Sequence, residues 1–126
     1  MKTRGEIEGD VCKGIARFEQ EYMGRGPKDF HAHLIGDLLV VHLRDVLTVA
    51  EQQLVKSLPT SNGPELLKQV RTLLMATARP VLDALVQKAT GTKVVSLHHH
   101  ISTVTGEEVV IFTLAEPPLF REPKKK

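Results

Sequence analysis

The segment from Asp29 to Arg44 constrains the fold more than any other part of the sequence. Polar and apolar residues alternate on both sides of Gly36-Asp37, and a two-residue turn that begins with glycine is typical of a β-hairpin. This turn fixes the register, so one face of the hairpin should be apolar and the other mixed. The pairs expected on the mixed face are Asp29 with Arg44, His31 with His42, His33 with Val40, and Ile35 with Leu38.

A second hairpin is expected from Lys93 to Leu114, with its turn near Val104-Thr105-Gly106. Its alternation predicts an apolar inner face and a mixed outer face. The inner face should contain Val95, Leu97, Val110, Phe112 and Leu114. The outer face should contain Ser96, His98, His100, Val109, Ile111 and Thr113, which leaves His99 on the inner side.

Three helical segments surround the hairpins in the sequence. Thr3 with Glu6, and Thr48 with Glu51, have the spacing of a capping box at the start of a helix. The first helix should end at Gly24 and the second near residue 57. The third helix has a broad apolar stripe, and Pro80 predicts a kink near Arg79. The stripe contains Leu66, Leu67, Val70, Leu73, Leu74, Ala78, Val81, Leu82, Leu85 and Val86.

The order of these elements predicts an α+β fold. Its sequence is α-β-β-α-α-β-β, in which two antiparallel hairpins form a four-stranded sheet with the helices on one face. One domain should cover residues 1–116, and a Pro/Lys-rich tail at 117–126 is expected to be disordered. The strand order that joins the two hairpins stays open at this point.

Charge and cysteine content exclude several classes of protein. The formal charge is +2, but three terminal lysines contribute +3, which leaves 2 − 3 = −1 for the rest. A basic footprint for nucleic acid is therefore missing. The single Cys12 cannot form an intrachain disulfide, and no segment has the ~20 apolar residues of a membrane helix. We expect a cytoplasmic protein without direct membrane insertion.

The six histidines all lie in the two predicted hairpins, and they suggest three interpretations. His31, His33 and His42 would share one sheet face, where neutral imidazoles could ligate a divalent metal. Alternatively, the histidines form a pH-sensitive surface, since imidazoles take up protons near neutral pH. The simplest interpretation is a half-buried surface or subunit interface. Ile35, Leu38, Val40, Val109 and Ile111 make that face too apolar for water, which favours a homodimer.

Other candidate residues have simpler explanations. Cys12 should be a small packing residue, and Glu107-Glu108 beside the turn should be solvated. Arg71 and Arg79 could bind an anion, but solvation or ion pairing is the simpler interpretation. No serine elbow, Walker loop, dinucleotide fingerprint or zinc knuckle is present, so we expect neither an enzyme nor a cofactor.

Several strings occur in an order that resembles a known family. They are Gly24-Arg25-Gly26-Pro27, Leu47-Thr48-Val49-Ala50-Glu51, Thr90-Gly91 before Val94-Val95-Ser96-Leu97-His98, and Gly106-Glu107 before Val110-Ile111-Phe112-Thr113-Leu114. From about Gly5 to Ala115 the chain resembles the MpsC-like family, small bacterial domains of uncharacterised function. The resemblance implies a link to a membrane-potential-generating system that moves sodium or bicarbonate, with this chain as an accessory or regulatory subunit. It implies no catalytic residues.

The residues therefore favour a non-enzymatic, self-associating domain with a second copy as its partner, and the resemblance implies an accessory role with a membrane complex as a further partner. The alternative is a sensor that binds a metal or small anion through His31, His33 and His42. An enzyme with an unfamiliar site is the third hypothesis. What covers the histidine-bearing face would distinguish the first two.

Overall fold

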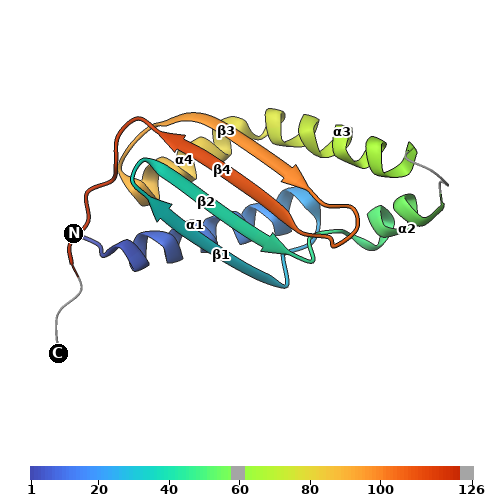
Figure 1. Ribbon diagram of the computed structural model, residues 1–126, viewed down its shortest axis with the longest axis horizontal. Coiled ribbons are helices and arrows are strands. Elements are labelled where there is room, and N and C mark those ends of the chain that lie inside the picture. Colours follow the sequence, from blue (N-terminus) through green and yellow to red (C-terminus); the bar gives the residue numbers. More distant parts are fainter. Residues whose placement is uncertain (58–61, 123–126) are drawn as a thin grey trace.

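A four-stranded antiparallel sheet forms the centre of the computed structural model, which describes residues 1–57 and 62–122. The strand order is β1-β2-β4-β3, so the two hairpins join through β2 and β4 (Figure 1). The strands are β1 (Asp29–Ile35), β2 (Leu38–Arg44), β3 (Val94–Ile101) and β4 (Glu108–Leu114). The predicted α+β class is confirmed.

The first hairpin has the register that its turn predicts. Asp29 pairs with Arg44, His31 with His42, and Ile35 with Leu38. Gly36 adopts a φ of 61°, the left-handed conformation that a tight turn with glycine first requires. The turn therefore sets which side chains share a face of the hairpin.

The second hairpin differs from the prediction at one end. The register is irregular between Val94 and Ser96, so Val94 pairs with Leu114, and Ser96 pairs with Thr113. The extra residue is Val95, which we expected on the inner face but which is 63% exposed. A bulge inserts an unpaired residue and redirects the side chains beside it. From Ser96 onward the predicted alternation holds.

The first helix is α1 (Arg4–Phe18), and its predicted capping box is present. The Thr3 hydroxyl accepts a hydrogen bond from the Glu6 amide, and the Glu6 carboxylate accepts one from the Thr3 amide. A π-helical segment, η1 (Glu19–Met23), continues α1 and ends at Gly24, whose φ is 86°. The predicted glycine stop is confirmed, whereas the wider turn before it was not expected.

The long third helix of the sequence prediction is two helices in the structure. They are α3 (Asn62–Thr77) and α4 (Arg79–Thr90), which follow α2 (Val49–Ser57). Ala78 between them has φ −86° and ψ 0°, and Pro80 lies in the first turn of α4. Proline has no N–H to donate and its ring clashes with the preceding turn, so a break replaces the expected kink.

The helices α1 and α4 cover one face of the sheet, as Figure 1 shows. Val11, Val41 and Phe112 lie at the centre of this core and are fully buried. In contrast, α3 packs chiefly against α2; one part of it lies beside β3, and its other end projects past the sheet. Part of the predicted apolar stripe is therefore exposed to solvent rather than buried. The exposed members are Leu66, Val70, Leu73, Leu74 and Val81.

The two ends of the described chain lie together. The Arg121 amide donates a hydrogen bond to the Lys2 carbonyl, and its guanidinium contacts Glu6 and the Met1 carbonyl. The predicted tail at 117–126 is thus described as far as Glu122, and residues 123–126 lie outside the described residues. The domain boundary at 116 stays a prediction. Within residues 1–57 and 62–122, no helix is long and apolar enough to cross a membrane.

Candidate functional site

The sheet side opposite α1 and α4 carries five of the six histidines. We call it the outer face, and it is not covered by any helix that the structure describes (Figure 1). His31 lies opposite His42, His98 opposite Ile111, and His100 opposite Val109. His99 pairs with Val110 on the inner side. The predicted placement of all six histidines is confirmed.

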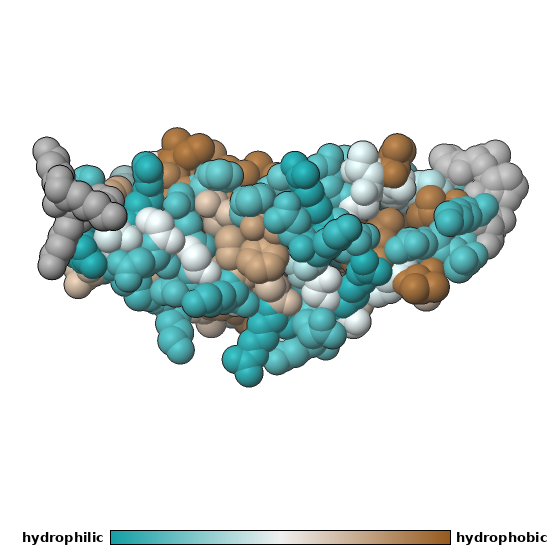
Figure 2. Space-filling view, turned by 90° about the horizontal axis from the view of Figure 1, so that it is seen from below, coloured by the Kyte–Doolittle hydropathy of each residue, from teal (hydrophilic) through white to brown (hydrophobic). Residues whose placement is uncertain are grey.

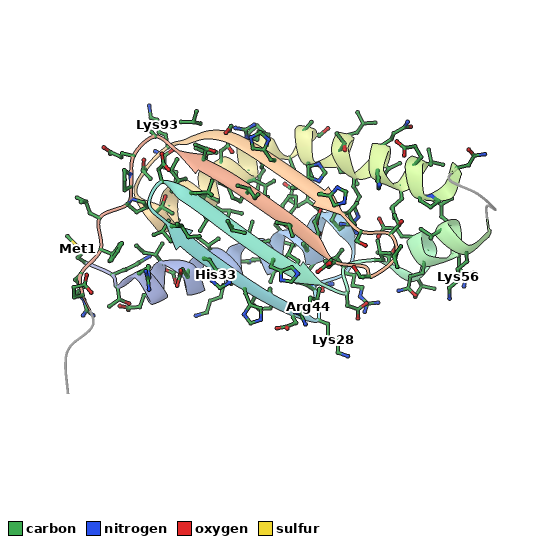
Figure 3. The ribbon with its side chains drawn as sticks, viewed as in Figure 1. Met1, Lys28, His33, Arg44, Lys56 and Lys93 are labelled. Carbon is green, nitrogen blue, oxygen red and sulfur yellow. The ribbon has the colours of Figure 1, made fainter. Side chains whose placement is uncertain are left out.

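The outer face combines these imidazoles with apolar side chains. Ile35 is 64% exposed, whereas Val40 and Ile111, opposite each other on the central strands, are partly buried by their neighbours. In Figure 3 the labelled His33 lies on β1 and Arg44 at the far end of β2. Leu38 and Val109 complete the apolar set. The outer face therefore has an apolar centre bordered by polar and ionisable groups.

Two of the histidines predicted to ligate a metal have carboxylate neighbours instead. His42 Nε2 lies 2.7 Å from Glu107 Oε2, and His31 Nε2 lies 3.4 Å from Asp29 Oδ1. The hydrogen bond with His42 is the main cause that lowers the pKa of Glu107. Among the side chains that the structure describes, no three of His, Cys, Asp or Glu are grouped as metal ligands. His31, His33 and His42 share a face but do not converge on one point.

A second polar group lies inside the protein, at the end of the sheet that meets α2 and α3. We call it the Arg71 cluster, and it contains Arg71, Glu19, Glu51, Glu108 and His99. The Arg71 side chain is fully buried. Its guanidinium donates to both carboxylate oxygens of Glu51, at 3.1 and 2.8 Å, and to the Val46 carbonyl at 3.1 Å.

Two buried carboxyl groups lie on the other side of the guanidinium. Arg71 Nη1 is 3.5 Å from Glu108 Oε1 and 3.7 Å from Glu19 Oε2. His99 Nδ1 lies 3.6 Å from Glu108 Oε2. The cluster therefore joins α2, α3, β3, β4 and the start of η1 through charged groups.

The pKa values of these two carboxyl groups are shifted in opposite directions. Burial, then the proximity and charge of Glu108, raise the pKa of Glu19 to about 9. Burial also tends to raise the pKa of Glu108, but the proximity of His99 and Glu19 and the charge of Arg71 outweigh it and lower this pKa. The environment thus favours the protonated form of Glu19 and the ionised form of Glu108.

The sequence interpretation missed this cluster, and its expectation for Glu108 was wrong. Glu107 is partly exposed, but Glu108 is fully buried, because it pairs with Leu43 and Ile101 on the inner face. Arg71 is ion-paired, one of its two expected states. The sequence does contain spacings that indicate burial of these charged residues. Arg71 lies four residues from Leu67 and from Met75. Glu19 likewise continues the spacing of Ile7, Val11 and Ile15.

Cys12 has the packing role that the sequence predicts. Its side chain belongs to the core that α1 forms against the sheet, and burial raises the pKa of its thiol. A buried thiol with a raised pKa is a poor nucleophile.

Comparison with known proteins gives one family and one curated relative. Residues 3–116 match a family model described as "Na+-translocating membrane potential-generating system (MpsC)". The chain is also 34% identical over 113 residues to the "Uncharacterized protein YbcI" of Bacillus subtilis (strain 168). That alignment covers 90% of this chain and 89% of the relative. No solved structure matches the chain.

Proposed function

The chain belongs to the MpsC family, and on that premise we propose that it is a non-enzymatic accessory or regulatory domain that self-associates through its outer face. The observation that carries this proposal is the uncovered sheet face with an apolar centre. Exposed apolar patches usually mark contacts, and a two-fold dimer is the commonest arrangement of identical chains. A second copy would cover Val40 and Ile111 on both partners.

The pattern of the outer face resembles that of known protein interfaces. Such surfaces have an apolar core and a polar rim. Here Val40, Val109 and Ile111 lie on the two central strands, and Arg44 and His33 lie toward the margin (Figure 3). This apolar centre and polar margin favour sheet-on-sheet packing of two copies. The view from below in Figure 2 looks along the sheet rather than onto the outer face, and that side of the molecule is mostly hydrophilic.

The family description supports the physiological setting of the proposal. It refers to a membrane potential-generating system that translocates Na+, and the sequence resemblance implies a link to sodium or bicarbonate movement. We place this domain beside such a system as an accessory or regulatory component in the cytoplasm. Its proposed partners are a second copy of the chain and the membrane complex.

Replacing Ile111 by lysine should abolish self-association. The added ammonium group would lie at the centre of the outer face, where burial against a second copy would cost several kcal/mol. Light scattering on the wild-type protein should give twice 14.0 kDa, and the variant should give 14.0 kDa. Circular dichroism of the variant checks that the sheet still forms.

Two matched lysine variants control this experiment. Val104 lies between β3 and β4 and is 93% exposed, and Leu73 is exposed on α3. We expect Val104→Lys and Leu73→Lys to keep the mass of the dimer. A monomer with Leu73→Lys, combined with a dimer with Ile111→Lys, would place the interface on α3 and contradict the proposal.

The alternative function is a sensor that binds a divalent metal or small anion through His31, His33 and His42. The observation in its favour is that these imidazoles share one face, with His31 directly opposite His42. Elemental analysis of untagged protein after addition of zinc or nickel distinguishes the two functions. The accessory-domain proposal predicts metal well below one equivalent. One equivalent that His42→Ala removes would establish the alternative.

A further inference from the structure

The buried pair of Glu19 and Glu108 contains more acceptors than the protein satisfies. Glu19 Oε2, Glu108 Oε2 and His99 Nδ1 are buried and have no hydrogen-bond partner among the described atoms. A buried polar atom without a partner lowers the stability of the folded protein. A proton on the Glu19 carboxyl group would supply a donor to Glu108 and satisfy both carboxyl groups at once.

The summed charge of the Arg71 cluster also favours the binding of a proton. Three ionised carboxylates and one guanidinium would sum to 1 − 3 = −2 inside the protein. Glu51 occupies two of the guanidinium donors, so one arginine cannot neutralise Glu19 and Glu108 as well. Two carboxyl groups that share a buried site cannot both be ionised without a large cost in free energy.

The Arg71 cluster connects two helices with the rest of the protein. Arg71 comes from α3 and Glu51 from α2, whereas Glu19 and Glu108 belong to the main body. Since α3 packs chiefly against α2, the ion pair of Arg71 with Glu108 joins this helix pair to β4 of the sheet. We propose that Glu19 and Glu108 hold one exchangeable proton, and that its release loosens the attachment of α2 and α3 to the sheet.

The step itself is a simple proton transfer. The O–H bond of Glu19 breaks, its electron pair stays on the carboxylate, and the proton passes to water. His99 lies next to Glu108 and its side chain is 12% exposed, beside a hollow that Thr72, Met75 and Leu97 line. His99 is the member of the Arg71 cluster that also lines this hollow, between β3 and α3. The groups that face the proton are therefore Arg71, Glu51, Glu108 and His99.

The pH dependence follows from the direction of the Glu19 shift. Its pKa in the folded protein is raised from 4.5 to about 9, so the folded state keeps a proton that the unfolded state has lost. The associated stabilisation is fully present below pH 4.5 and is lost as the pH rises toward about 9. The α2–α3 pair should therefore open more readily at alkaline pH.

The most direct test is a pH titration of ¹³C-labelled wild-type protein by NMR. The side-chain carbonyl resonance of Glu19 should shift between pH 8 and pH 10, as a pKa raised to about 9 requires, whereas an ordinary glutamate titrates in the acidic range. The exposed Glu21 in the same segment serves as the internal reference. A Glu19 resonance that has completed its titration below pH 6 would overturn the proposal.

The mechanical consequence is tested by hydrogen exchange in α3. After correction for the intrinsic effect of pH, exchange in α3 should accelerate at least tenfold relative to α1 between pH 7 and pH 10. Glu19→Gln keeps a neutral donor, so it should remove this acceleration, whereas Glu21→Gln should retain it. Equal acceleration in the wild type and Glu19→Gln, or none in the wild type, would contradict the link to α3.

Discussion

Replacing Arg71 by methionine is expected to lower the free energy of unfolding by about 3–5 kcal/mol, because removal of one partner leaves buried charges without compensation. Glu108 is fully buried, and the guanidinium is its nearest cation. Stabilities of native domains are only about 5–15 kcal/mol, so this loss is a large fraction of the total. Urea denaturation at pH 7.5, followed by circular dichroism, measures it.

Two further measurements separate this electrostatic effect from a loss of packing. Arg17 forms an exposed ion pair with Glu21 on α1, so Arg17→Met should change the stability by less than about 0.5 kcal/mol. The loss in free energy of unfolding caused by Arg71→Met should also be smaller at pH 5 than at pH 8, since protonation of the carboxylates removes the unpaired charge. A defect that is independent of pH would show that packing alone is responsible.

Replacing Phe112 by alanine is expected to cost about 3–5 kcal/mol as well, through a different cause. Phe112 is fully buried in β4, between Leu39 of β2 and Leu97 of β3. Truncation removes apolar contacts and leaves a cavity that the central strands cannot close. The midpoint of urea unfolding should fall, while the slope of the transition stays unchanged.

The matched control for Phe112 lies on the same hairpin but outside the core. Val104 is almost fully exposed, so Val104→Ala should leave the urea midpoint within error of the wild type. A Phe112→Ala loss below about 1 kcal/mol would contradict the placement of this ring at the centre of the core.

The sequence predicts those parts of the fold that short-range rules determine. Gly36-Asp37 sets a two-residue turn, and the register from Asp29 to Arg44 follows without any knowledge of the rest of the chain. The capping boxes at Thr3 and Thr48 likewise mark the starts of α1 and α2. Each of these features depends on residues that are close together in the sequence.

The features that sequence patterns did not predict depend on contacts between distant elements. The bulge at Val95 changes which side chain faces the core, and alternation alone does not reveal it. The stripe on α3 indicates burial, but the side of this helix that is buried carries Leu67, Arg71 and Met75, so Leu73 is 68% exposed. The strand order β1-β2-β4-β3 depends on pairing between the two hairpins.

The candidate sites were predictable to different degrees. The positions of the outer-face histidines follow from strand alternation, and the structure confirms them. The Arg71 cluster does not follow from strand alternation, because charged residues are rarely fully buried and are therefore expected at the surface. A charged residue at a core position of the pattern, such as Glu108 before Val110 and Phe112, is the signal that would have found it.

Sedimentation of the untagged wild-type protein over a hundredfold range of concentration tests whether the protein self-associates. The proposal predicts a species of twice 14.0 kDa that dissociates only on dilution. A single species of 14.0 kDa at the highest concentration would contradict it.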